Sequence, residues 1–138
     1  MKTCTLFFAL FALAMTFSFD AQSDEPKEQK KEPTYTTSAL GQELIETLEL
    51  AFSQRLKEYT FGRSGPEHAI RLNAQLYREQ IGAASADSKK IVAEQYLARA
   101  TQIETLTKVH FDNGIGLSQQ YLEAKAARIS AELELEKF

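Results

Sequence analysis

The chain has 138 residues and a net charge of −3, from sixteen Lys and Arg residues against nineteen Asp and Glu residues. This weakly acidic balance argues against nucleic acid as a partner. The single cysteine, Cys4, excludes a framework of internal disulfides.

Residues 1–23 predict a secretory signal peptide. Lys2 precedes an uncharged apolar run of 15 residues, from Thr5 to Phe19, which Asp20 ends. A short basic region, an apolar stretch and small residues after it are typical of an export signal. The run is shorter than the about 20 residues that a membrane-spanning helix needs, so an uncleaved anchor is the weaker alternative.

Cleavage is expected after Ser23, with Ser18 as the alternative position. Lipidation at Cys4 is rejected because a lipoprotein cysteine follows the apolar stretch, whereas Cys4 precedes it. Cleavage removes the cysteine, both methionines and five of the nine phenylalanines. We therefore expect an exported protein, with no transmembrane segment after cleavage.

Residues 24–37 are rich in charge and almost free of apolar side chains up to Tyr35, which predicts a disordered charged linker. Thr37 and Ser38 are both good helix N-caps, so folded structure is expected to begin there.

Residues 38–138 are dominated by strong helix formers and predict one helical domain. Apolar residues recur every three or four positions, which is the period of a helix packed on neighbours. The expected core lines are Ile45, Leu48, Phe52, Leu56 and Tyr59; then Ala69, Leu72 and Leu76 with Ile70, Ala74, Tyr77 and Ile81; then Val92, Tyr96, Ala100, Ile103, Leu106 and Val109; and last Leu122, Ala126, Ile129 and Leu133 with Tyr121, Ala124, Ala131 and Leu135.

Three breaks separate the four predicted helices. Pro66 suits the first turn of the second helix, with Ser64 or Gly65 as its cap. The third helix follows the break at 82–87 and is expected to be capped by Ser85 or Asp87. The glycine-containing segment 113–116 is expected to end it.

The two halves of the domain, 38–84 and 85–138, resemble each other at an offset of 50. Leu56 meets Leu106, Phe61 meets Phe111, and three further identities follow, at Leu72, Ala74 and Arg78 with Leu122, Ala124 and Arg128. Two hairpin repeats predict an all-α fold of antiparallel helical hairpins, an elongated up-down-up-down four-helix bundle or coiled coil. Both glycine turns would lie at one end of it.

The predicted core is thin because its lines contain much alanine, which buries little apolar surface per residue. We therefore expect modest stability or self-association.

No catalytic, phosphate-binding or haem-binding motif is present, so we expect neither an enzyme nor a cofactor. His68 and His110 are weak metal candidates because both are expected near the glycine turns, although two imidazoles alone make an incomplete site. The acidic helix faces are expected to be solvated surface.

The segment from His110 to Glu136 resembles the hairpin region of the TolC family of outer-membrane efflux proteins. The matching features are Phe111, Gly114, Leu122, Ala124 and the tail Ala131-Glu132-Leu133. The family also carries two related hairpins per chain. Its members are several times longer, and they often have an acidic residue at a position occupied here by Gln120 and, in the first half, by Ile70.

The resemblance implies a protein of the periplasm or envelope of a Gram-negative-type bacterium. It also implies that the glycine turns are tips that contact other envelope proteins. The interaction residues would then be Gly62, Arg63, Gly65, Asn113, Gly114 and Gly116. The expected function is that of an exported helical structural or interaction protein, with an envelope protein or a second copy of the chain as partner. The alternative is a small helical bundle that binds a metal or an apolar ligand or acts as a chaperone.

Overall fold

The computed structural model describes residues 32–138, so the predicted signal peptide 1–23 and the linker residues 24–31 lie outside it. Four α-helices and one short 3₁₀ turn, η1, make up the described chain. Their bounds are α1 Ala39–Thr60, α2 Pro66–Ala83, η1 Ala86–Ser88, α3 Lys89–Asp112 and α4 Ser118–Leu135. The predicted all-α class is therefore confirmed.

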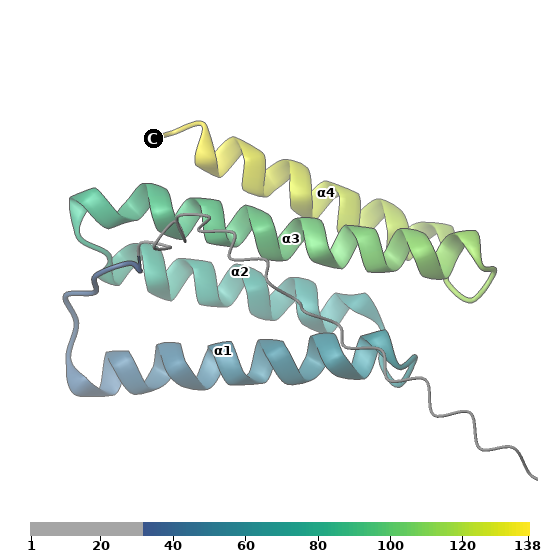
Figure 1. The fold of residues 1–138 in the computed structure, drawn as a ribbon, viewed down its shortest axis with the longest axis horizontal. Coiled ribbons are helices and arrows are strands. Elements are labelled where there is room, and N and C mark those ends of the chain that lie inside the picture. The colour runs from purple at the N-terminus through teal and green to yellow at the C-terminus, as the bar shows by residue number, and fades with distance from the viewer. Residues whose placement is uncertain (1–31) are drawn as a thin grey trace, which may run out of the picture.

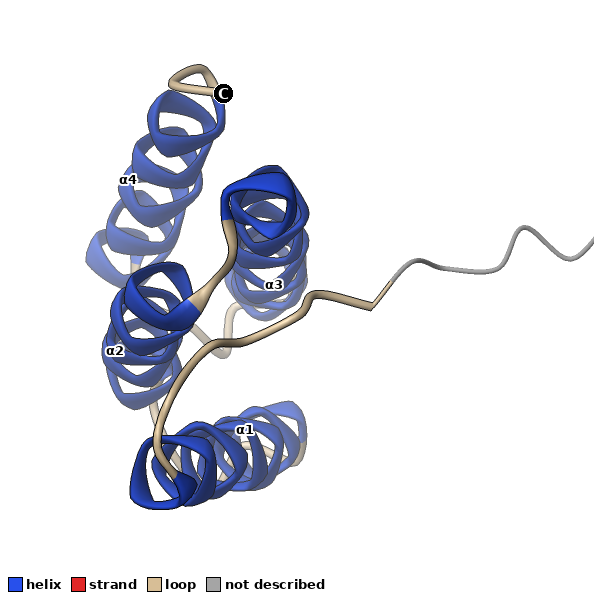
Figure 2. Cartoon of the chain, turned by 90° about the vertical axis from the view of Figure 1, so that its left-hand side faces the viewer, coloured by secondary structure: helices blue, strands red, loops and turns tan. Residues whose placement is uncertain are grey.

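Successive helices run in opposite directions, and each packs on the next one in the chain (Figure 1). The central helix α2 contacts α1, α3 and α4. Viewed along the helices, α2 lies between α1 on one side and the pair of α3 and α4 on the other (Figure 2). The hairpins therefore form an open array, in which one side of α4 has no neighbour among the helices of residues 32–138.

The first two helix starts follow their predicted caps. The Ser38 hydroxyl accepts a hydrogen bond from the Gly41 N–H at 3.2 Å, and Pro66 opens α2 after Gly65. The prediction for the third helix was wrong, because neither Ser85 nor Asp87 caps α3. Instead the chain makes the η1 turn first, where the Ser88 N–H donates to the Ser85 carbonyl at 2.9 Å.

Both glycine turns end their helices in the same way. Gly62 and Gly114 have φ values of +68° and +71°, and the residue after each donates its N–H to a carbonyl five positions earlier. This is the hydrogen-bond pattern of a Schellman helix end. The two turns align with an offset of two residues more than the 50 of the sequence repeat, since Gly62 corresponds to Gly114. Phe61 is therefore equivalent to Asn113 rather than to Phe111.

The core forms three separate clusters along the array. The five predicted core residues of α1 are its five buried residues. On α4 only one of the two predicted lines is correct: Ala124 and Ala131 are buried, while the line through Leu122 faces solvent. Six of the sixteen buried apolar residues are alanines, each of which buries little apolar area.

The last residues of the predicted linker contact the turn between α2 and α3 instead of running free. The Thr36 N–H donates to the Ala83 carbonyl at 2.7 Å, and the Ser85 N–H donates to the Thr34 carbonyl at 3.2 Å. Tyr35 forms an isolated antiparallel bridge with Ala84 and packs against two of the core clusters. The chain therefore enters the fold at the end opposite the glycine turns.

Within residues 32–138, no helix has the length and apolar character needed to cross a membrane.

The glycine turns give a test of the fold. Replacing Gly114 with alanine forces a side chain into the left-handed region, so we expect the free energy of unfolding to fall by about 1 kcal/mol. Replacing Gly82 with alanine should raise it by about 0.5 kcal/mol, because Gly82 has helical backbone in the last turn of α2. A Cβ added there meets nothing within 4 Å. Urea unfolding followed by circular dichroism measures both, and equal effects of the two variants would contradict the assigned backbone.

Candidate functional site

The two glycine turns, α1–α2 and α3–α4, lie at one end of the array, as predicted (Figure 1). Gly62 and Gly114 make the turns through their positive φ values, and Gly65 stands directly before α2. The Gly116 N–H donates to the His110 carbonyl at 3.1 Å, which folds the second turn back onto α3. The backbone of both turns is therefore held in a defined shape.

Large apolar side chains stand exposed around these turns. Phe61 is 65% exposed and Ile115 is 73% exposed, although both are bulky and apolar. The exposed group, which we call the tip surface, consists of Phe61, Val109, Phe111, Ile115 and Leu117. Exposed apolar groups gathered in one region of a protein commonly mark a contact with another molecule. The sequence indicated the glycines of this end, whereas the structure adds the side chains that a partner would touch.

Neighbouring side chains orient two of these rings. The guanidinium of Arg63 lies over the Phe61 ring, 6.0 Å from its centroid. The Phe111 ring stacks on that of Tyr121, with centroids 5.9 Å apart. Phe61 also lines two hollows on the surface of α1, with volumes of about 270 Å³ and 440 Å³.

The two histidines, although both near the tips, have different neighbours. The Nδ1 of His68 lies 3.0 Å from the Arg71 guanidinium, and the His110 ring packs edge-on against Tyr59 with centroids 4.7 Å apart. Residues 32–138 contain no group of three or more His, Cys, Asp or Glu side chains that could hold a metal ion. No contact joins the two imidazoles within the described chain.

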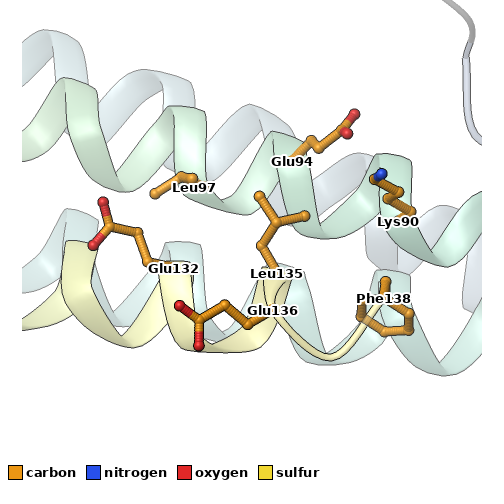
Figure 3. A pocket seen from close by; sticks show the side chains of 7 residues that line it. All are labelled: Lys90, Glu94, Leu97, Glu132, Leu135, Glu136 and Phe138. Carbon is orange, nitrogen blue, oxygen red and sulfur yellow. The ribbon is translucent and has the colours of Figure 1, made fainter.

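At the opposite end, a pocket of about 530 Å³ lies between α3 and α4 (Figure 3). Leu97 and Leu135 project into the space between the two helices. The remaining lining residues are charged or terminal: Lys90, Glu94, Glu132, Glu136 and Phe138. Three carboxylates around an apolar floor suit neither an anion nor a purely apolar ligand.

A polar cluster lies in the middle of the array, where the sequence predicted only apolar contacts. Asn73 and Gln80 on α2 are 2% and 0% exposed. The Arg99 side chain reaches over from α3: its Nε donates to Asn73 Oδ1 at 2.7 Å and its Nη2 to Gln80 Oε1 at 2.9 Å. Asn73 donates in turn to the Tyr96 carbonyl at 3.3 Å. The cluster joins the first hairpin to the second.

The positive charge of Arg99 is partly balanced by a carboxylate that lies nearby. Gln80 donates to Glu49 Oε1 at 2.8 Å, which brings a carboxylate from α1 to the same place. Burial lowers the pKa of Arg99, and the nearby Glu49 and Tyr35 act in the opposite direction. Arg99 also lines a polar hollow of about 370 Å³ with Glu49, Gln95, Ala98 and Gln102. The Arg99 nitrogens bond the neutral amides of Asn73 and Gln80 on α2. The cluster therefore joins the two hairpins structurally.

A signal for this cluster was present in the sequence. Asn73 and Gln80 continue the spacing of Ala69 and Leu76 along one face of α2, and Arg99 follows Tyr96 by three positions on α3. Polar residues on an apolar line are expected to bond one another when the line is buried. An analysis based on apolar spacing alone passes over them.

Comparison of the chain with protein-family models, curated proteins and solved structures gives no match. The resemblance to the TolC family therefore stays a prediction.

The polar cluster predicts a large loss of stability when its arginine is removed. In Arg99→Met, the buried oxygens of Asn73 and Gln80 lose their donors, so the free energy of unfolding should fall by about 2–3 kcal/mol. The matched control is Arg78→Met on the exposed side of α2, for which we expect a change within about 0.5 kcal/mol. Chemical unfolding measures both.

The triple variant Arg99→Met, Asn73→Leu, Gln80→Leu removes the whole cluster and should recover much of that loss, since no buried polar group is left unpaired. If the single and triple variants were equally unstable, the loss would come from packing alone.

Proposed function

We propose that this chain is an exported helical interaction protein of the cell envelope, which contacts a protein partner through the tip surface. The observation that carries the proposal is the gathering of exposed apolar residues at the end where both glycine turns lie. Both hairpins contribute to it, with Phe61 from the first and Ile115 from the second. A partner could therefore contact both repeats at once.

The shape of the turns supports docking at this end. Each turn is closed by backbone hydrogen bonds around a glycine of positive φ, so its neighbours are held in place before a partner arrives. Ordering a flexible loop on binding costs free energy, and a preformed turn avoids most of that cost. Arg63 over Phe61 adds a cation beside an aromatic ring, a pair often used in interfaces.

Export is proposed from residues 1–23, and the partner is proposed to be another envelope protein. The likeness of residues 110–136 to the periplasmic hairpins of TolC-type proteins agrees with docking at the tips. No catalytic step is proposed, and the tips act by contact alone.

Site-specific photo-cross-linking in the native host tests the docking surface. A photoreactive side chain at position 61 or 115 should give one adduct of the same composition from both positions. The matched control is position 50, because Leu50 is also apolar and strongly exposed but lies in the middle of α1. The measurement is mass spectrometry of the purified adducts.

Substitution tests the same contact by loss. The variant Phe61→Ser, Ile115→Ser should lose the adduct formed by a second probe placed at position 111, while Leu50→Ser should keep it. No adduct from either tip position, or the same adducts from position 50, would contradict docking through this end.

A further inference from the structure

Helix α4 carries two apolar lines on opposite faces. Ala124 and Ala131 are buried against the rest of the chain, whereas Leu122, Ile129 and Leu133 are 61%, 42% and 56% exposed. Successive residues of a helix turn by about 100°, which places the exposed line on the far side of the helix from the two alanines. Leu122, Ile129 and Leu133 therefore point away from the fold, while Leu135 of the same helix packs against the core.

The packing of α2 shows what α4 lacks. Leu76 of α2 packs on α1, while Tyr77 on the same helix packs on the α3 side, so both of its apolar lines are covered. On α4 the only fully covered residues are alanines, which bury little area. The outer face of α4 therefore resembles a helix-packing surface on which no helix of the described chain lies.

The spacing of the outer line points to the kind of helix that fits. Leu122, Ala126, Ile129 and Leu133 follow one another at intervals of four, three and four residues, which is the repeat of a coiled-coil seam. We propose that this seam joins two copies of the chain, with their α4 helices packed antiparallel about a two-fold axis.

Antiparallel packing matches the side chains by size. When Ala126 of one copy lies opposite Ile129 of the other, Leu122 lies opposite Leu133, and each contact recurs through the two-fold axis. Every layer then contains at least one large side chain. A parallel pair would place Ala126 against Ala126 and leave a gap in the middle of the seam, which close-packed contacts avoid.

The charges beside the seam fit the same arrangement. Lys125 and Glu132 lie on one flank of the outer line, seven residues apart. In the antiparallel pair this flank faces its own copy, so Lys125 of each chain approaches Glu132 of the other. Lys125 makes no ion pair with any residue of the described chain. Glu132 pairs with Arg128 of its own helix and lines the α3–α4 pocket, so its side chain turns away from that pocket to reach Lys125 of the other copy.

The size of α4 sets the strength of the contact. An 18-residue helix is about 27 Å long, and one such helix pair buries less than the about 800 Å² per partner of a standard interface. The dimer is therefore reversible and depends on concentration. The tip surface takes no part in it, so failure of this contact and failure of tip docking are distinguishable.

Analytical ultracentrifugation of the purified protein over a dilution series tests the proposal. We expect the mass of one chain at low concentration and of two chains at high concentration. Ile129→Glu should weaken the association at least roughly tenfold, since it places an unpaired charge in the seam. The control Leu50→Glu, on exposed α1 surface, should associate as the unchanged protein does.

A charge exchange tests the register without removing apolar surface. Lys125→Glu and Glu132→Lys should each weaken the dimer, and the two changes in one chain should restore it. Circular dichroism of every variant checks that the monomer is folded. We expect it to be, because neither Lys125 nor Glu132 is buried. Equal weakening in the single and double variants would overturn the register.

Thiol cross-linking distinguishes the two directions of packing. In a chain with Cys4→Ser, the variants Ala126→Cys and Ile129→Cys should cross-link readily when mixed and poorly when each is alone. Efficient self-linking of Ile129→Cys would indicate a parallel pair and overturn the proposal. So would a single-chain mass at every concentration, or binding of the outer face to lipid vesicles in place of dimerisation.

Discussion

The array depends on the joint between its two hairpins, and the centre of that joint is the Arg99 side chain. Helices α2 and α3 meet through apolar residues and through the stacked rings of Tyr77 and Tyr96, whose centroids are 4.3 Å apart. Arg99 adds directional bonds to Asn73 and Gln80, seven residues apart on α2. A slip of α3 along α2 would break both bonds and leave buried oxygens unpaired. The cluster therefore defines how the hairpins are aligned, and with it the relative heights of the two glycine turns.

Much of the fold was predictable from spacing and helix-ending residues. On α1 one stripe of large apolar residues repeats without interruption, and all five are buried. Ser38, Pro66 and the glycines at 62 and 114 act through local backbone chemistry, so they can be recognised without knowing the neighbours. The common end of the two glycine turns was predictable too, because four helices joined by short links run alternately up and down.

The errors arose where packing between distant segments decides the outcome. α4 has two apolar lines of similar strength, and only the position of α3 shows which line is inside. The buried amides of α2 are polar by type, and they become core residues only because Arg99 lies opposite. The tip surface also depends on solvent exposure. The sequence predicted the glycine turns beside it, whereas Phe61 and Ile115 stand out only once their exposure is known. The repeat at an offset of 50 followed residue identities, whereas the turns themselves follow backbone hydrogen bonds.

The bridge between Tyr35 and Ala84 fixes the end of the helix array at which the chain enters it. The chain enters the fold beside the α2–α3 turn. Helix α1 then spans 22 residues, or about 33 Å, before the first glycine turn. Anything that holds the protein by residues ahead of this bridge holds it by the end remote from Phe61 and Ile115. The helices then act as a rigid spacer, and their length sets how far from the attachment point the tips can reach.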